Sequence, residues 1–535
     1  MNSLGDLEYR VYFLEEYEQN KIIHLYHTFH EECVHHLDGD KSFVLYSPKT
    51  KSYLVVRDII GISPVYYAFL NDKFYFSKDI GTLFRQSGIA KVVNLKTMQY
   101  IVKHSTIPYE ETMYQDIKRL PPGHFMQVSS AGKCTIKRYW KPEKIEINYK
   151  VTEAEAKEQF RTLFDKAIFN RIDDIKTTGF ELSGGLDSSS IVSWVKHKKP
   201  QDKISAFSMN FKSMESCDES EYVDAMQEKY TLNLQNIAAD KMDYESQYNL
   251  ENNYTLNPYW PIFITYTMGF SVVEKAKELG IKTILTGQGG DNILSGNFYV
   301  LDEYFKNFQW IQLYKEVKAL PNRKSFIKRY LIAPLLGKNN IQRLRLISHR
   351  IKGKEVFKDI SQDIFKESSE YYTGGSSSFQ CDLEQILHST LSALMDSSYY
   401  AVAEEHFGIK FKHPFFDKQL IEFILTLPPK FKYSEGISKQ LLRTIMKDIL
   451  PEKIRLRRDK AEFSEVLNQQ IDSIDLDDLL NNANLVKLGL IEQETLDKYK
   501  EDYLSGKMKK IIYFWQIINL EYWYRFNFIE NGVEI

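Results

Sequence analysis

The residues of this chain that most clearly suggest chemistry lie at positions 183–189, which read Ser-Gly-Gly-Leu-Asp-Ser-Ser. Two adjacent glycines let backbone N–H groups converge on one anion without obstruction by Cβ atoms, and the serine hydroxyls add further donors. A helix that begins just after the glycines adds the positive end of its dipole. This run therefore predicts a cradle for phosphate groups.

Asp187 lies inside the predicted cradle, so a cation must offset its charge, and we expect Mg²⁺. A second run at positions 286–291 reads Thr-Gly-Gln-Gly-Gly-Asp and ends in another carboxylate, Asp291. We therefore expect Asp187 and Asp291 to be Mg²⁺ ligands beside pyrophosphate. Because the chain lacks the GxxxxGK[ST] motif of kinase-like phosphate loops, we expect ATP to be cleaved between its α and β phosphates. The residues expected to bind ATP or pyrophosphate are Ser183, Gly184, Gly185, Asp187, Ser188, Ser189, Gly287 and Gly289.

Each glycine-rich run should follow a β-strand. Short apolar runs predict strands at 178–182, 204–210, 234–238 and 282–286. Helical periodicity predicts helices near 154–169, 188–196, 220–230 and 263–279. Strands that alternate with helices in this way indicate a parallel, doubly wound α/β sheet, and such sheets bind ligands beyond the carboxyl ends of their strands.

The first part of the chain has a different pattern. Residues 41–77 alternate apolar and polar side chains between short turns, which predicts an antiparallel sheet. A strand expected at 134–140 leads into residues 141–150, which are rich in Lys and Glu and are expected to be a linker. We therefore predict two domains, 1–150 and 151–535.

Composition narrows the class of protein. The 535 residues carry a formal net charge of -2, which gives no global field for nucleic acid, and we expect no nucleic-acid partner. The four cysteines form no CxxC pair, so neither a zinc site nor a disulfide framework is expected. The chain starts without a signal-peptide pattern and contains no apolar run of about 20 residues, so we expect a soluble, cytoplasmic protein without a membrane span.

Two further segments are unusual. Residues 300–360 are helical in pattern and rich in Lys and Arg, which fits either a solvated helical surface or a docking surface for an acidic peptide. Residues 372–378 form a low-complexity stretch of Gly and Ser, which we expect to be a flexible loop over the site.

The two glycine-rich runs together resemble the synthetase domain of the asparagine synthetase family, which includes β-lactam synthetases and the lasso cyclases that close lasso peptides. The resemblance continues in residues 405–417, 421–428, 436–443 and 450–463. It implies an N-terminal, Ntn-type glutaminase-like β domain and a C-terminal ATP-pyrophosphatase domain of the adenine nucleotide alpha hydrolase kind, with a helical C-terminal part. In this family a lysine stabilises charge at the acyl-adenylate and the tetrahedral intermediate, and Lys460 fills that position.

Residues 37–39, 57–67 and 119–123 are similar to the later part of the family's glutaminase domain. Those glutaminases use an N-terminal cysteine whose α-amine assists it, whereas this chain begins Met-Asn-Ser. Cys33 cannot substitute, because an internal cysteine has no free α-amine. We therefore expect a degenerate glutaminase-like domain that serves as a structural platform.

The resemblance implies an ATP- and Mg²⁺-dependent, AMP-forming amide synthetase. Gln288 and Asn292 stand where asparagine synthetases usually carry acids, which favours a lasso cyclase. Such an enzyme joins the N-terminal amine of a ribosomal precursor peptide to an Asp or Glu side chain, and it works with a leader-peptide protease and a leader-recognition protein. The alternatives are an ammonia-dependent asparagine synthetase-like enzyme, a catalytically silent scaffold of a peptide-maturation complex, and a tRNA-modifying enzyme. No residue is assigned as the base that takes the amine's proton; Glu404 and Glu405 are candidates only because they lie in the matched region.

Overall fold

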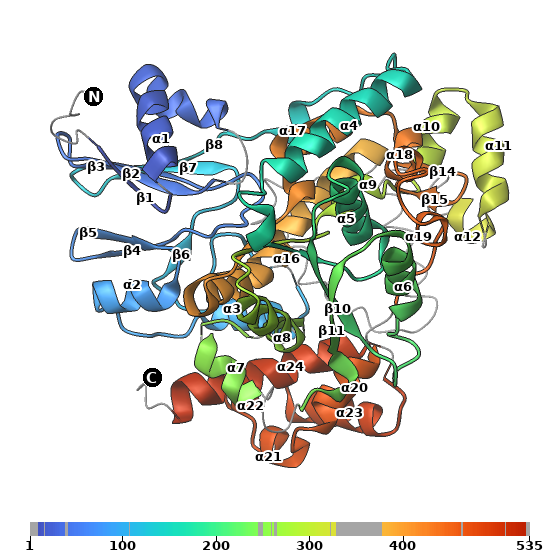
Figure 1. The fold of residues 1–535 in the computed structure, drawn as a ribbon. Helices are drawn as coiled ribbons and strands as arrows, with labels where there is room; N and C mark the ends of the chain where they lie inside the picture. The colour runs from blue at the N-terminus through green and yellow to red at the C-terminus, as the bar shows by residue number, and fades with distance from the viewer. Residues whose placement is uncertain are drawn as a thin grey trace.

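The structure is a computed structural model, and it combines an antiparallel β part with a parallel α/β part (Figure 1). The residues that it describes are 9–14, 16–37, 41–105, 107–243, 250–257, 259–261, 265–320, 323–327, 377–461, 464–508 and 510–530. Most of the basic segment at 300–360, and residues 372–376 of the predicted loop, lie outside the described residues. No helix in the described part of the chain is both long enough and apolar enough to cross a bilayer.

The N-terminal part contains two antiparallel sheets. The first has the strand order β1-β2-β3-β7-β8, and the second has the order β5-β4-β6. Their strands are β1 (Arg10–Tyr12), β2 (Phe43–Ser47), β3 (Ser52–Val56), β4 (Tyr66–Leu70), β5 (Lys73–Ser77), β6 (Lys118–Arg119), β7 (His124–Val128) and β8 (Cys134–Arg138). The antiparallel pairing predicted for residues 41–77 is confirmed. Helices α1 (Glu16–Phe29), α2 (Ile80–Ser87) and α3 (Leu95–Val102) accompany these sheets.

The parallel sheet has the strand order β11-β10-β9-β12-β13. Its strands are β9 (Thr178–Glu181), β10 (Ser205–Asn210), β11 (Asn233–Ala238), β12 (Thr283–Leu285) and β13 (Lys410–Lys412). Four of them match the predicted strands, and every pairing is parallel. The fifth, β13, was not predicted. It is three residues long and reads Lys-Phe-Lys, so it has too little apolar pattern to be recognised, and short charged strands are typical of sheet edges.

Helices between these strands lie close to their predicted positions: α4 (Glu153–Phe169), α5 (Leu186–Lys198), α6 (Ser220–Lys229) and α8 (Thr265–Glu278). The start of α4 is fixed by a capping box in which Thr152 and Glu155 exchange hydrogen bonds. Helix α5 begins two residues earlier than predicted, with Gly185 as its N-cap. Asp187 therefore belongs to the first helical turn, where the positive end of the helix dipole favours a carboxylate.

The remaining helices follow the parallel sheet or cover it. They are α7 (Leu250–Leu256), α9 (Gly290–Leu294), α10 (Val300–Lys306), α11 (Trp310–Ala319), α12 (Arg323–Ile327), α16 (Ser378–Phe407), α17 (Lys418–Thr426), α18 (Gln440–Ile445), α19 (Glu452–Arg455), α20 (Ser464–Asp472), α21 (Leu476–Leu480), α22 (Asn484–Lys487), α23 (Gln493–Leu504) and α24 (Ile511–Tyr524). Helices α20 to α24 gather at the bottom of Figure 1, next to the sheet.

The N-terminal and C-terminal parts share their hydrophobic cores. One buried cluster joins Phe43 and Val56 of the first sheet to Phe164 of α4 and Phe415, and a second joins Tyr114 to Trp523 of α24. Polar contacts add to this: Trp140 donates its indole N–H to Glu422 over 3.1 Å. The antiparallel part is thus packed firmly against the parallel α/β part. Strand β8 ends at Arg138 and α4 begins at Glu153, and a domain boundary near residue 150 stays a prediction.

Candidate active site

The first glycine-rich loop connects β9 to α5 at the carboxyl end of the sheet. Ser183 accepts the N–H of Gly185 over 3.2 Å, and its own N–H donates to Ser188 Oγ over 3.2 Å. Gly184 has φ 77°, and a Cβ there would lie 2.8 Å from Cβ of Tyr222. Among the described residues no side chain caps α5. The first N–H groups of this helix therefore remain available to an anion, as the sequence predicts.

The second loop connects β12 to α9 and packs directly on the first. A Cβ at Gly287 would lie 2.6 Å from the backbone N of Ser188, and a Cβ at Gly290 would overlap the carboxylate of Asp187. Gly289 has φ 92°, and a Cβ on it would meet the ring of Phe416 at 2.6 Å. Only glycine allows the two loops to approach this closely, so the second run of glycines is explained by loop packing.

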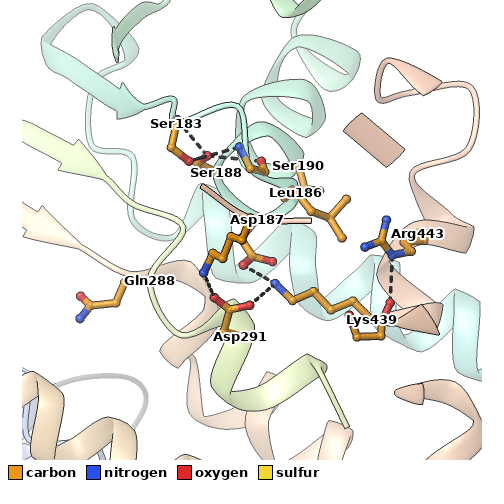
Figure 2. A network of polar contacts seen from close by, with 12 residues as sticks. Ser183, Leu186, Asp187, Ser188, Ser190, Gln288, Asp291, Lys439 and Arg443 are labelled. Atoms are coloured by element: carbon orange, nitrogen blue, oxygen red, sulfur yellow. Dashed lines mark hydrogen bonds and ion pairs between the residues drawn. The ribbon is translucent and has the colours of Figure 1, made fainter. Parts of the chain in front are cut away.

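Two lysines and the two predicted metal ligands form an alternating cluster between the loops. Lys439 Nζ lies 2.5 Å from Asp187 Oδ2 and 2.7 Å from Asp291 Oδ1, and Lys460 Nζ forms an ion pair with Asp291 Oδ2. Figure 2 shows the Lys439 side chain extended between the two carboxylates. The side chain of Lys439 is only 7% exposed, whereas that of Lys460 is 75% exposed. Lys439 is therefore a fixed part of the site, and Lys460 faces the open side.

The charges in this cluster shift each other's pKa values. Burial raises the pKa of Asp187, and the ammonium of Lys439 offsets this effect only in part. Burial also opposes ionisation of Asp291, but Lys439 and Lys460 together outweigh it and lower the pKa of that carboxyl to about 2. Asp291 is thus ionised throughout the physiological range, which suits a group that binds a cation.

A cavity of about 450 Å³ opens onto this cluster. Both glycine-rich loops line it, together with the segment around Lys460 and the side chains of Tyr399 and Tyr400. Tyr400 donates its hydroxyl to Gln288 Oε1, and Arg443 and Arg457 add positive charge to the wall. The cavity therefore contains donors and cations on the side of the loops and neutral aromatic side chains on the side of α16.

The donor set fits Mg²⁺ that is shared with phosphates. Asp187 Oδ1 is buried and has no hydrogen-bond partner among the described residues. No group of three or more His, Cys, Asp or Glu in the described part of the chain could hold a metal alone. Mg²⁺ is commonly held by one or two carboxylates, with phosphate oxygens and water completing its coordination. Asp187 and Asp291 match that pattern, and their assignment as ligands stays a prediction.

Most of the predicted site residues meet at this cavity. Those that line it are Ser183, Gly185, Asp187, Ser188, Gly287, Asp291 and Lys460. Gly184 and Gly289 do not line the cavity, but their positive φ angles set the backbone conformation of the two loops. Ser189 is fully buried in the first turn of α5. Glu404 and Glu405 do not line this cavity; they line a separate one. The geometry gives no support to either of them as a base at the reacting centre.

Sequence reasoning missed Lys439 as a site residue. The segment at 436–443, which contains Lys439, was identified only as part of the family resemblance. Lys439 has φ 58° and is the N-cap of α18, so an unusual backbone conformation turns its side chain toward the loops. The available signal was a lysine that follows Gly-Ile-Ser at the start of a helix. The local sequence does not indicate that the ammonium of this lysine reaches Asp187.

Comparisons with known proteins agree with this geometry. A model of the family described as asparagine synthase matches residues 159–525, and one described as glutamine amidotransferase domain matches residues 9–140. The chain belongs to the asparagine synthase family. As a member of this family it is an ATP-dependent, amide-forming ligase, and its fold is a glutamine amidotransferase-like antiparallel part followed by a parallel α/β synthetase part.

The chain is similar to several curated members of the asparagine synthase family. Asparagine synthetase [glutamine-hydrolyzing] 1 of Bacillus subtilis is 23% identical over 98% of this chain and 83% of that protein. The probable asparagine synthetase of Dictyostelium discoideum is 25% identical over 56% of this chain and 51% of that protein. A solved glutamine phosphoribosylpyrophosphate amidotransferase from B. subtilis has 10% identity and a TM-score of 0.18, covering 53% of this chain and 65% of that one, which supports no inference.

The cysteines in the matched amidotransferase region are poorly placed for catalysis. Cys33 is fully buried, and burial raises the pKa of its thiol to about 12. Cys134 lies on β8, and partial burial raises its pKa as well. Reactive cysteines have lowered pKa values and positive surroundings. Neither thiol therefore has the properties of the nucleophile of a glutaminase.

Proposed function

We propose that this asparagine synthase family member adenylates a carboxylate with ATP and then joins the acyl group to an amine. The observation that carries this proposal is the alternating cluster of Asp187, Lys439, Asp291 and Lys460 at the meeting point of two glycine-rich loops. The cluster places two cations and a free helix N-terminus around one space, where pyrophosphate can bind and leave.

In the first step a substrate carboxylate oxygen attacks the α-phosphorus of ATP. The bond from that phosphorus to the bridging oxygen breaks, and pyrophosphate departs with the electron pair. Ser183, Ser188 and the first N–H groups of α5 receive its oxygens, while Lys439 offsets their charge from a fixed position. Mg²⁺, held by Asp187 and Asp291, supplies further positive charge when bound.

In the second step an amine nitrogen forms a bond to the acyl carbon of the mixed anhydride, the bond from that carbon to the phosphate oxygen breaks so that AMP leaves with the electron pair, and the amine releases a proton, for which no residue is assigned. The oxygen of that acyl group becomes negative as the tetrahedral intermediate forms. Lys460 faces the open side of the cavity and, among the described residues, forms an ion pair with Asp291 alone, so its ammonium can reach this oxygen. A positive charge next to a developing oxyanion lowers the barrier.

The first candidate for the two substrates is aspartate with ammonia. Two relatives from B. subtilis that match 98% and 93% of this chain are both named asparagine synthetases, which supports this candidate. Incubation with aspartate, ammonium and ATP should then give asparagine and AMP without any peptide. Glutamine should not replace ammonium, because neither Cys33 nor Cys134 is placed to hydrolyse it.

A second candidate is macrolactam synthesis by a lasso cyclase. It is favoured by the uncharged wall that Gln288, Tyr399 and Tyr400 form, with Tyr400 donating to Gln288. Amide groups of a peptide match this wall better than the charged amino group of free aspartate does. The substrate is then a precursor peptide whose leader has been removed, and a leader-peptide protease and a leader-recognition protein are the expected partners.

One experiment separates these candidates. Exchange of labelled pyrophosphate into ATP reports carboxylate activation alone. Exchange that depends on aspartate identifies the first candidate, and exchange that requires a peptide with an internal Asp or Glu and a free N-terminal amine identifies the second. An Asp187→Asn variant should abolish either activity. Absence of exchange with every carboxylate would contradict the proposal and favour a catalytically silent scaffold.

A further inference from the structure

A second, larger cavity lies between the antiparallel part and the synthetase part. Its volume is about 660 Å³. The N-terminal segments around Phe13, Ser63 and Lys78 line one side, and α16 and β13 line the other. Tyr400 of α16 lines both this cavity and the nucleotide cavity. The two spaces are therefore neighbours that share Tyr400 in their walls, and the hydroxyl of Tyr400 donates to Gln288 in the nucleotide cavity.

Almost every cation on the wall of this larger cavity has a carboxylate partner. Lys412 pairs with Asp173 over 2.8 Å, Arg171 with Asp417 over 3.0 Å, and Lys410 with Glu404 over 3.8 Å. Lys41 forms an ion pair with Glu18. These pairs neutralise the lining at four places, so the wall as a whole does not attract an anion.

Lys78 differs from these cations. Within the part of the chain that the structure describes, no carboxylate lies within ion-pair distance of its Nζ, which contacts the carbonyl oxygen of Phe13 at 3.3 Å and faces the Phe13 ring at 5.3 Å from its centroid. It lies where this cavity meets a smaller one of about 200 Å³, and it lines both. Burial lowers the pKa of Lys78, because a charged ammonium without a paired anion is poorly solvated there. An anion in the cavity would remove this cost.

The surroundings of Lys78 limit the charge of that anion. Asp79 and Glu405 also line this cavity and belong to none of the four ion pairs named above, so they would repel a phosphate dianion more strongly than a singly charged carboxylate. A single carboxylate carries one negative charge, which the one positive charge of the Lys78 ammonium can neutralise. The volume of the cavity is far larger than one carboxylate needs, so the carboxylate belongs to a larger molecule. Its position beside Tyr400 places the rest of such a molecule against the nucleotide cavity.

We propose that this larger cavity is a substrate site in which Lys78 binds a carboxylate that is not itself adenylated, on an amino-acid or peptide substrate. This inference rests on the proposed function, because it assigns the site to a substrate of that reaction. It makes Lys78 a specificity-determining residue outside the nucleotide cavity. Free aspartate and a peptide are the two sources of such a carboxylate, and the cavity volume favours the peptide.

Chemical labelling of Lys78 tests this site without any turnover. The full-length protein is treated with an acetylating N-hydroxysuccinimide ester, and the rate of modification at Lys78 is followed by mass spectrometry. The probes are trialanine, trialanine amide and aspartate. We expect trialanine to slow labelling at least threefold and its amide to have no effect, since only the free carboxylate can pair with Lys78. Protection by aspartate equal to that by trialanine would identify an amino acid as the source.

Three outcomes would overturn the proposal. They are equal protection by trialanine and its amide, no protection by any carboxylate, and a Lys78 that never reacts and so does not face an open cavity. These outcomes leave pyrophosphate exchange untouched, so failure of this site is distinguishable from failure of the proposed function.

Variants provide the second test, once exchange has identified a substrate. Lys78→Met should raise the KM for the carboxylate-bearing substrate at least tenfold, with kcat and the KM for ATP within twofold of wild type. Lys78→Arg keeps the charge and should restore the KM to within threefold. Lys412→Met removes a paired cation from the same wall and is the matched control. Equal effects of Lys78→Met and Lys412→Met would contradict a specific role for Lys78.

Discussion

The ammonium of Lys439 lies 2.5 Å from the carboxylate of Asp187, although 252 positions separate the two residues in the sequence. Both side chains are almost completely removed from water. Since a buried carboxylate without a partner is strongly unfavourable, this contact serves two purposes. It opposes the rise in the pKa of Asp187 that burial causes, and it joins α18 to α5 across the cavity.

Replacing Lys439 by Met should therefore impair both stability and activity. We expect a loss of ~3 kcal/mol in the free energy of unfolding, since Asp187 is left buried and unpaired, and a fall in pyrophosphate exchange on the order of 100-fold. Denaturant unfolding and the exchange assay measure the two effects. The double variant Lys439→Met/Asp187→Asn should recover stability without recovering exchange. Recovery of both would mean that the pair serves the fold alone.

Arg457 should position the segment that carries Lys460. Its guanidinium lies 2.5 Å from Glu219 and stacks over the ring of Tyr222, 4.0 Å from its centroid. Tyr222 and the carbonyl of Glu219 also bound the space at Gly184. Arg457→Gln should lower kcat roughly 10-fold to 100-fold, because a small misplacement of a reacting group is costly, and should leave the KM for ATP within threefold.

The matched control for Arg457 is the Lys453–Glu221 pair, which joins α19 to α6 at 2.6 Å, close to Arg457 and Glu219 in the sequence, but is exposed. Exposed pairs contribute little, so Lys453→Gln should leave kcat within twofold of wild type. The effects of Arg457→Gln and Glu219→Gln should not be additive in a double-mutant cycle. Additive effects would show that the two residues act separately.

Gly287→Ala should disrupt the contact between the two loops. The added methyl group would lie 2.6 Å from the backbone N of Ser188, which a packed backbone cannot accommodate without moving. We expect ATP affinity to fall at least tenfold in equilibrium binding measurements. Gly489→Ala is the control: it has φ 68° but open space around it, so it should cost ~1 kcal/mol of stability and leave ATP affinity unchanged. Normal affinity in Gly287→Ala would contradict the loop contact.

The lowered pKa of His124 should make the free energy of unfolding depend on pH. Burial lowers the pKa of this imidazole to about 4 in the folded protein, and its Nδ1 lies 2.7 Å from the carbonyl oxygen of Pro122. The unfolded chain, with a histidine pKa of ~6.5, binds the proton first as pH falls. The contribution of His124 to the free energy of unfolding should therefore be fully present above pH ~6.5 and decrease by up to ~3 kcal/mol as pH falls to about 4.

His124→Gln should reduce this dependence of stability on pH, and His24→Gln, at an exposed histidine, is the control. An unchanged slope in His124→Gln would contradict the assignment.

Local sequence was sufficient to predict the positions of the two glycine-rich loops and most of the parallel sheet. The glycines of 183–189 and 286–291 mark turns that only glycine permits, and the strands before them are apolar runs of ordinary length. The cluster around Asp187 could be predicted only in part. Asp187 and Asp291 lie in the motifs themselves, and Lys460 was identified through family resemblance.

The other site residues depend on contacts that are distant in sequence. Lys439 reaches Asp187 through a left-handed backbone at the start of α18, and Arg457 is held by Glu219, 238 positions away. Strand β13 pairs with β12 only because α16 returns the chain to the sheet. The cavity lined by Lys78 and Tyr400 has no local signal at all, since these residues belong to different parts of the chain. Pairings of this kind are set by tertiary packing.

The most direct test of acyl-adenylate formation follows the oxygen atoms of the substrate carboxylate. Attack of that carboxylate on the α-phosphorus transfers one of its oxygens to AMP. With aspartate or peptide labelled with ¹⁸O at the reacting carboxylate, mass spectrometry of the nucleotide product should find AMP that carries one ¹⁸O, in an amount equal to the amide formed. ADP with labelled inorganic phosphate would show attack at the γ-phosphorus instead and would contradict the proposed reaction.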